Sequence, residues 1–292
     1  MSGRVQRFLF EGLDIRGAIV HLDETWMQMQ ANRDYQPTVA QLLGEMAAVT
    51  ALIACQLKQP GRLTLQLRSN GPIQLLVMDC NEQLQMRGMA RSNPVVLPAP
   101  VPVLLGAQDG GQLLMSLDLP TARQPYQSFV PLVGDSIAAI FEHYLEQSEQ
   151  QPSRLFATAS PRAAACLFLQ KLPSADQHDP DGWARITQLA ATVKNSELLE
   201  LDAETLLSRL FHEEIEARGL RIFDAQPVVY HCPEDWEKVR DMIRSLGRTD
   251  AETILAEHGE ILIRDDICNR NYRFSADDIA QLFDQDAGQT RH

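Results

Sequence analysis

The hydrophobic pattern of the chain changes its period at Pro60-Gly61, and this change limits the folds that the first part of the chain can adopt. From Pro37 to Lys58 apolar residues recur every three to four positions, which predicts one long helix that ends at Pro60-Gly61. From Leu63 onwards apolar and polar residues alternate, and turn sequences stand at 69–72 and 79–81, which predicts antiparallel strands. A helix beside an antiparallel meander indicates an α+β fold.

Breaker-rich and polar sequence at 173–181 predicts the end of this first domain, so we expect an N-terminal core domain over residues 1–174. Residues 175–229 then predict a helical linker with two apolar faces. Because amphipathic helices must bury their apolar faces, these either cover the large domain or bind a partner. The first face consists of Trp183, Ile186, Leu189 and Val193, and the second of Leu206, Leu207, Leu210 and Phe211.

The last part of the chain, residues 230–292, predicts a small separate unit. It begins with a helix that Pro233 introduces, and Thr249 to Glu252 has the pattern of a capping box for a second helix. Two short strands, 261–264 and 272–274, are expected to face each other across a loop that holds Cys268. A unit this small often needs a metal, a disulfide or docking to a neighbour for stability.

Charge is distributed unevenly along the chain, whose formal net charge is −13. Residues 1–174 contain 14 acidic and 13 basic residues, whereas residues 175–292 contain 25 acidic and 13 basic residues. The acidic second part would repel phosphate backbones, so we expect no nucleic-acid partner. The N-terminal apolar stretch is too short for a signal peptide, and we expect no membrane-spanning stretch of about eighteen apolar residues. The sequence therefore predicts a cytoplasmic protein.

Motifs of the common enzyme classes are absent from the sequence. It has no phosphate-binding G-x-x-x-x-G-K-[ST] loop and no G-x-S-x-G elbow, and no second His follows His212 at metalloprotease spacing. Cys55 and Cys166 lie in apolar patterns and are expected in the core, while Cys80 lies at a predicted turn beside Asp79. Five widely spaced cysteines also argue against a disulfide scaffold. We expect a protein that is not an enzyme.

Several long segments, in order along the chain, resemble the redox-regulated chaperone family of heat-shock protein 33. They are RGAIVHLDETW (Arg16–Trp26), VAQLLGEMAAVTALIACQLK (Val39–Lys58), GRLTLQLRSNGPIQLLVMD (Gly61–Asp79), MRGMAR (Met86–Arg91), YQSFVPL (Tyr126–Leu132), YLEQSEQ (Tyr144–Gln150) and LFHEE (Leu210–Glu214). Small departures occur at Ser128, where the family typically has Gly, and at Cys166-Leu167-Phe168, where it has a longer Leu run.

The resemblance implies a holding chaperone that binds unfolding proteins without ATP and prevents their aggregation under heat or oxidative stress. It implies no nucleotide, unfolded client proteins as partners, and a homodimer as the active form. In the family a zinc-bound C-terminal unit clamps the linker onto the large domain. Oxidation of four cysteines expels the zinc, unfolds clamp and linker, and exposes the client-binding surface. By this analogy Trp183, Ile186, Leu189 and Val193 form the cover.

The family's switch motifs, C-x-C and then C-x-x-C, are altered in this sequence. The first pair reads Cys232-Pro233-Glu234, and the second reads Asp265 to Cys268. All four positions carry side chains that can coordinate a metal, but zinc in structural sites prefers thiolate and imidazole to carboxylate ligands. The sequence therefore leaves two alternatives, a mixed-ligand zinc site or a metal-free unit, and we favour the second. Cys232 and Cys268, 36 positions apart, could still form one disulfide bond.

Two other functions compete with the chaperone hypothesis. A thiol-disulfide oxidoreductase would use Cys232 and Cys268, although such enzymes usually need a close C-x-x-C pair. A constitutive adaptor would use the linker helices to hold one fixed partner. Turnover of a dithiol substrate would indicate the enzyme, and promiscuous suppression of aggregation would separate a chaperone from an adaptor.

Overall fold

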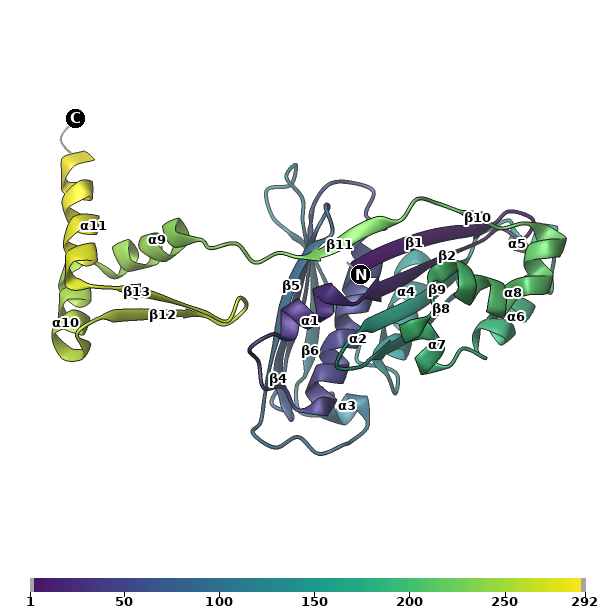
Figure 1. Cartoon of the computed structure of the whole chain (residues 1–292), viewed down its shortest axis with the longest axis horizontal. Coiled ribbons are helices and arrows are strands. Elements are labelled where there is room, and N and C mark those ends of the chain that lie inside the picture. Colours follow the sequence, from purple (N-terminus) through teal and green to yellow (C-terminus); the bar gives the residue numbers. More distant parts are fainter. Residues whose placement is uncertain (1–2, 290–292) are drawn as a thin grey trace. The chain divides into compact units, whose positions relative to one another are not determined.

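The computed structural model describes residues 3–289, with side chains described as far as residue 284. The chain divides into two compact units, residues 1–231 and residues 232–292 (Figure 1). Each unit contains hydrophobic cores of its own, two in the first unit and one in the second. The two units are therefore described one after the other.

The first unit is built on one large sheet with the strand order β7-β6-β3-β4-β5-β11-β1-β2-β9-β8 and with β10 paired to β1. Neighbouring strands run antiparallel, except that β11 runs parallel to β5. The strands are β1 (Gly3–Phe10), β2 (Ile15–Leu22), β3 (Arg62–Arg68), β4 (Ile73–Asn81), β5 (Gln85–Ser92), β6 (Gln112–Asp118), β7 (Tyr126–Val130), β8 (Ser153–Ala159), β9 (Ala164–Lys171), β10 (Arg221–Ile222) and β11 (Gln226–Tyr230).

Helices cover both faces of this sheet (Figure 1). The larger core lies between one face and α2, with α1 and α4 at its margins. The second core lies between the opposite face and helices α6, α7 and α8. The helices of this unit are α1 (Glu24–Gln30), α2 (Pro37–Ala54), α3 (Val101–Leu104), α4 (Ile137–Glu149), α5 (Ala175–His178), α6 (Gly182–Ala190), α7 (Asn195–Glu200) and α8 (Ala203–Arg218).

Helix α2 is the central helix of the larger core. Pro37 starts it, as suits a residue without a backbone N–H in the first turn, and 13 of its 18 residues are buried. Among the described helices α2 is long and apolar enough to cross a membrane, with a mean hydropathy of 1.4, but 72% of it is buried inside the protein. The expectation that no stretch approaches such a length was therefore wrong for α2, which is a core helix.

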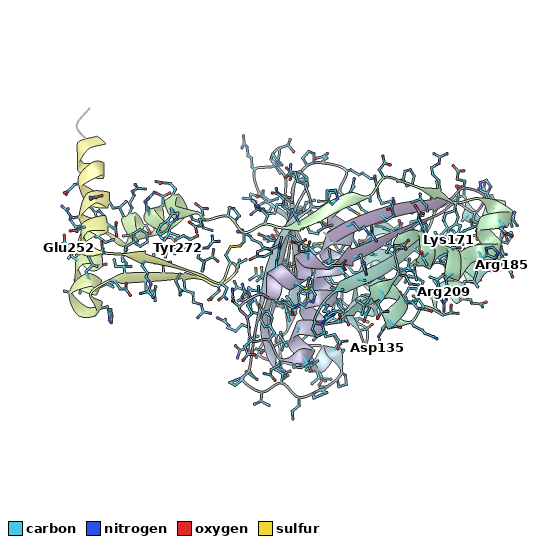
Figure 2. The ribbon with its side chains drawn as sticks, in the orientation of Figure 1. Asp135, Lys171, Arg185, Arg209, Glu252 and Tyr272 are labelled. Atoms are coloured by element: carbon cyan, nitrogen blue, oxygen red, sulfur yellow. A yellow bond between two sulfur atoms is a disulfide. The ribbon has the colours of Figure 1, made fainter. Side chains whose placement is uncertain are left out.

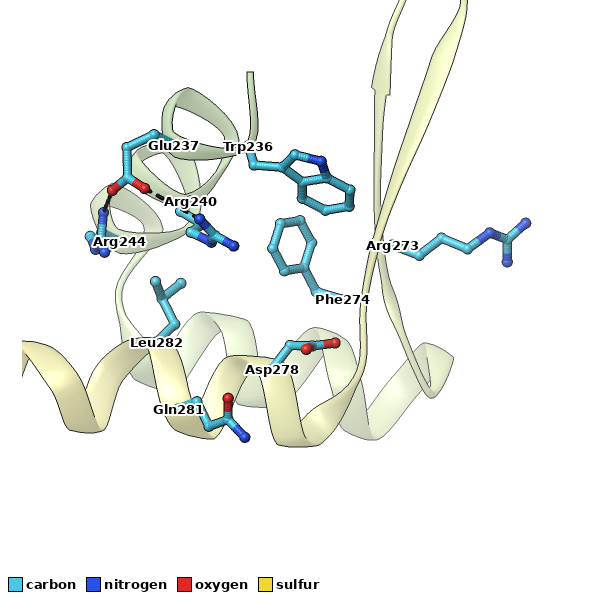
Figure 3. A pocket seen from close by; sticks show the side chains of 9 residues that line it. All are labelled: Trp236, Glu237, Arg240, Arg244, Arg273, Phe274, Asp278, Gln281 and Leu282. Atoms are coloured by element: carbon cyan, nitrogen blue, oxygen red, sulfur yellow. Dashed lines mark hydrogen bonds and ion pairs between the residues drawn. The ribbon is translucent and has the colours of Figure 1, made fainter. Parts of the chain in front are cut away.

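The second unit contains three helices and a two-stranded antiparallel sheet within the described residues: α9 (Trp236–Leu246), α10 (Arg248–His258), β12 (Ile261–Asp265), β13 (Arg270–Phe274) and α11 (Ala276–Gln289). Trp236 packs edge to face against Tyr272 and Phe274, at ring-centroid distances of 4.8 and 5.8 Å. Figure 3 shows Trp236 and Phe274 at a pocket of about 440 Å³, beside two arginines that contact Glu237.

The α+β fold with a large antiparallel sheet and a small C-terminal unit is confirmed, but several local predictions were wrong. Cys80 lies in β4 and is buried, because that strand continues through the predicted turn and ends at Asn81. Helix α10 starts at Arg248 without a side-chain cap, so the predicted capping box does not form. Helix α9 starts at Trp236 rather than at Pro233, because Asp235 caps it through Lys238 N.

Candidate functional sites: a covered sheet face and a disulfide-linked hairpin

The strands β1, β2 and β9 bury apolar side chains on both of their faces, whereas an antiparallel sheet with one side in water buries them on one face only. One set of side chains faces α2, and the alternate set faces away from it. This second set would form an exposed apolar surface if nothing covered it. It consists of Phe8, Phe10, Ile15, Ile19, Ala165, Leu167 and Leu169.

The helices α6, α7 and α8 cover this apolar sheet face. Ile186 is fully buried there, and the three other residues expected in the cover are partly buried and pack against the same cluster. Those three are Trp183, Leu189 and Val193. The apolar face of α8, which the sequence indicates as a separate stripe, joins the same cluster with α7 through Leu198, Leu206, Leu207, Leu210 and Phe211.

Helix α8 bends to fit the sheet. Its N-terminus is capped by Asp202, whose side chain accepts a hydrogen bond from Thr205 N at 3.0 Å. At Phe211 the backbone leaves helical geometry, with φ −128° and ψ 22°, and the buried ring packs edge to face on Phe10 at a centroid distance of 5.3 Å. The helix is therefore shaped for contact with β1.

Polar contacts tie these helices together. Arg185, labelled in Figure 2, donates from Nε to Glu214 at 2.7 Å and from Nη2 to Asp179 at 2.9 Å. Arg218 reaches the same Asp179 oxygen at 2.9 Å. Hydrogen bonding to Arg185 is the first cause that holds the pKa of Asp179 below its usual range. A further contact anchors α7 to the sheet, because His21 Nε2 lies 2.5 Å from the carbonyl oxygen of Leu199.

In the second unit, Cys232 and Cys268 are joined in a disulfide bond with a Cα–Cα distance of 5.7 Å. The bond links the segment that follows β11 to the loop between β12 and β13. The sequence analysis left this pairing open, and the structure brings the two residues together.

The two carboxylates at the remaining switch positions have local partners. Asp265 Oδ1 accepts hydrogen bonds from the backbone N–H groups of Ile267 and Cys268, at 3.0 and 3.1 Å, so it stabilises the hairpin turn. Glu234 Oε2 accepts from the indole N–H of Trp236 at 2.7 Å, and its other oxygen lies 3.7 Å from Arg270 Nε. Both carboxylates therefore take part in local contacts of the C-terminal unit.

This arrangement does not fit a zinc ion. Structural zinc sites need deprotonated thiolate or imidazole ligands at one point, and both sulfur atoms here are bonded to each other. No group of three or more His, Cys, Asp or Glu side chains in the described part of the chain is placed to hold a metal.

The three other cysteines are free thiols in the first unit. Burial raises the pKa of Cys55 to about 11 and that of Cys80 to about 12, and it raises the pKa of Cys166 further. A thiol with a raised pKa is a poor nucleophile at neutral pH. Cys166 is buried in the core as expected for a small apolar residue. Cys55, which was also expected in the core, is half-buried, and Cys80 is buried although it was expected at a turn.

Comparison with known proteins identifies the class to which this architecture belongs, that of the 33 kDa chaperonins. The family model described as Hsp33 protein matches residues 3–275, and the chain belongs to the Hsp33 family. The 33 kDa chaperonin of Methylobacillus flagellatus is 39% identical over 97% of this chain and 95% of its own length. That of Pseudomonas aeruginosa is 40% identical over 100% of this chain and 99% of its own length.

The crystal structure of the 33 kDa chaperonin from Thermotoga maritima has the same fold. It superimposes with a TM-score of 0.81 and 22% sequence identity, covering 99% of this chain and 100% of that one. Family membership makes the chain a chaperone rather than an enzyme, with unfolded proteins as its clients. Hsp33 proteins usually bind zinc, and the described residues of this chain show no such site.

Proposed function

We propose that this chain is an ATP-independent holding chaperone whose client-binding surface is the apolar sheet face beneath α6, α7 and α8. The observation that supports the proposal is this covered face itself, because its apolar side chains would form one contiguous exposed patch once the helices leave, and such patches bind other apolar surfaces. When the helices leave, an apolar surface and their own apolar stripes become available to unfolding clients.

Within the predicted linker, 175–229, the helices α5 to α8 form the releasable part, whereas β10 and β11 pair with β1 as part of the sheet. Fully burying one side chain such as Ile186 stabilises the covered form by about 1.5–3 kcal/mol. The conformational entropy that the released helices regain offsets much of the total, so modest heating can shift the balance.

Light scattering of a heat-denatured client protein tests this function. We expect the full chain to suppress scattering in proportion to its concentration, without ATP, for several unrelated clients. Suppression for one client alone would favour the adaptor alternative. Turnover of a dithiol substrate by Cys232 and Cys268 would contradict the proposal and favour the oxidoreductase alternative, because the disulfide bond between these residues is the group that such an enzyme would use.

We further propose that the C-terminal unit governs the release of the linker, and that the disulfide strengthens this unit instead of destabilising it. In a zinc-bound switch, oxidation removes the metal that holds the unit together. Here the two sulfur atoms crosslink the unit. The carboxylate of Asp265 accepts a hydrogen bond in the hairpin turn, and that of Glu234 accepts one from the indole of Trp236 at the start of α9. Heat is then the main trigger, and oxidation opposes activation. We also place the protein in the cytoplasm, with a homodimer as its active form.

A further inference from the structure

A cavity of about 460 Å³ lies in the first unit beside the C-terminal end of α2, on the sheet face opposite the linker helices. The strand register explains it. Val5, Val20 and Cys166 form one cross-strand row, which α2 covers, since the Cys166 thiol approaches the carbonyl oxygen of Ala48 at 3.6 Å.

The next row along the strands is Arg7, Ala18 and Phe168. Helix α2 ends at Ala54, with Cys55 as its C-cap, so it does not continue over this row. The small side chain of Ala18 leaves a hollow between its larger neighbours. Leu9 and Leu57 extend the apolar lining, and Cys55 also borders the cavity.

The rim of the cavity carries three cations, Arg7, Arg16 and Lys58, in a chain of net charge −13. Arg16 lies 3.6 Å from Glu149, but no carboxylate among the described residues forms an ion pair with Arg7 or Lys58. The Arg7 guanidinium lies over the ring of Phe223, 5.7 Å from its centroid. Two exposed cations therefore lack a carboxylate partner at the mouth of an apolar cavity.

The pocket of the second unit provides a contrast. Its arginines are each paired with an acidic residue: Arg240 and Arg244 with Glu237 (Figure 3), and Arg273 with Glu260. An anion entering that pocket would compete with carboxylates already in place. An anion at the cavity beside α2 would meet charges that have no such partner.

We propose that the cavity beside α2 binds an anionic amphiphile of the medium-chain fatty acid class. Its carboxylate pairs with Arg7 and Lys58, and its apolar chain lies against Leu9 and Leu57, which are partly exposed apolar side chains of the lining. The volume is within the range of small-molecule sites, and a few charged groups at the mouth of an apolar cavity provide the orientation that such sites need. An extended client segment would need a longer groove.

Isothermal titration calorimetry of the full chain tests the proposal with dodecanoate below its micelle concentration. We expect saturable binding of one dodecanoate per chain. Dodecyltrimethylammonium, which has the same tail and the opposite charge, should bind at least about tenfold more weakly. Equal affinity for the two amphiphiles, or no saturable binding of dodecanoate, would overturn the proposal.

Matched variants locate the site. Arg7→Gln with Lys58→Gln should weaken dodecanoate binding about tenfold or more, because both charge-assisted contacts are lost. Arg123→Gln with Arg162→Gln removes the same charge from exposed positions elsewhere and should leave the affinity unchanged. An equal loss in both double variants would show a diffuse charge effect and would contradict a site at this cavity.

Cys55 provides a second readout, because it borders the cavity and the other described free thiols are buried. Bound dodecanoate should slow alkylation of Cys55 by iodoacetamide several-fold at pH 9 in the folded protein. No protection at saturating dodecanoate would contradict the assignment. Equal protection of Cys55 by a neutral apolar peptide in the wild type and in the Arg7 and Lys58 double variant would instead reassign the cavity to client segments.

Discussion

Asp265 shows how a single substituted residue can take a structural role where the family's motif places a zinc ligand. Its carboxylate accepts two backbone hydrogen bonds in the turn that holds Cys268. The sequence alone shows that a carboxylate stands at this position and that a carboxylate is a poor zinc ligand. It does not predict the structural role of Asp265, because an Asp accepts hydrogen bonds from the N–H groups two and three residues later only where the chain turns.

Replacing Asp265 with alanine should weaken the C-terminal unit by about 1 kcal/mol, because two turn N–H groups lose their acceptor. Asp265→Asn retains one acceptor oxygen and should retain most of the stability. Limited proteolysis of the unit at rising temperature measures the difference. Asp266→Ala, at the exposed neighbouring position, is the matched control. Equal stability of Asp265→Ala and the wild type would rule out the turn role.

Glu45 is a second residue with a measurable signature. It is buried in α2, and desolvation raises its pKa to about 7 from an ordinary value of 4.5, although the amide of Gln41 donates a hydrogen bond to it. The folded state therefore holds a proton that the unfolded state releases between these two values. The ionisation of Glu45 therefore costs the folded protein nothing below about pH 4.5, and this cost grows between pH 4.5 and 7 and stays constant at higher pH.

Glu45→Gln should accordingly stabilise the protein at pH 8, by up to about 3 kcal/mol, and should have little effect near pH 4.5. Melting temperatures of both proteins between pH 5 and 8 measure the effect. The exposed Glu24→Gln is the control for charge. A difference in melting temperature that stays constant over this pH range would mean that Glu45 does not titrate there.

At the scale of elements, the accuracy of the sequence predictions follows the range of the interactions that form each element. Helix α2 and the strands from β3 to β5 follow local periodicity, and they were predicted. β1 and β2 were missed, and the strands β10 and β11 were taken as the end of the linker. β10 and β11 depend on pairing with the distant β1, as Gly3 with Val228 shows, and no local pattern specifies such a pairing. β1 and β2 pair with each other as a local hairpin, but β2 is buried on both faces and therefore lacks the alternation of apolar and polar residues that marks a strand.

For the linker helices, too, the sequence predicts what depends on local pattern and not what depends on distant contacts. Their apolar stripes are readable from the sequence, but the surface that receives them is not, because it is the second face of strands that are apolar on both faces. The four expected cover residues are one edge of a larger contact. The main part comes from α8, whose bend at Phe211 has no clear sequence signal.

Ile186→Asp tests the cover directly. A carboxylate at this fully buried position should weaken the packing of α6 by several kcal/mol and release the segment without heat or oxidant. We expect suppression of client aggregation at a temperature where the wild type is inactive. Gln188→Asp places the same charge at an exposed position of α6 and should behave as the wild type. A folded Ile186→Asp protein with no basal activity would argue against release of α6 as the activating step.

For the whole molecule, we propose that the C-terminal unit determines whether oxidation favours or opposes activation. The disulfide closes a span of 36 residues, which restricts the unfolded unit by about 3–4 kcal/mol on the chain-entropy model. A zinc-bound switch loses its metal when its thiols are oxidised, so oxidation favours the open form. Under the proposed function, the same chemistry in this chain would add a crosslink without expelling a metal, and we therefore expect oxidation to favour the closed form.

Reduction should therefore lower the temperature at which the chaperone becomes active. Cys232→Ser and Cys268→Ser should both lower it as well, should keep most of the heat-induced activity, and should no longer respond to dithiothreitol. Cys55→Ser leaves the disulfide intact and should respond as the wild type. Light scattering of a client during heating, with and without reductant, measures these shifts.

We also expect the purified protein to contain well under one zinc ion per chain, which a metal analysis measures. Stoichiometric zinc bound through Cys232 and Cys268, released by peroxide as activity rises, would instead show that the carboxylates of Glu234 and Asp265 complete a working metal switch in the reduced protein.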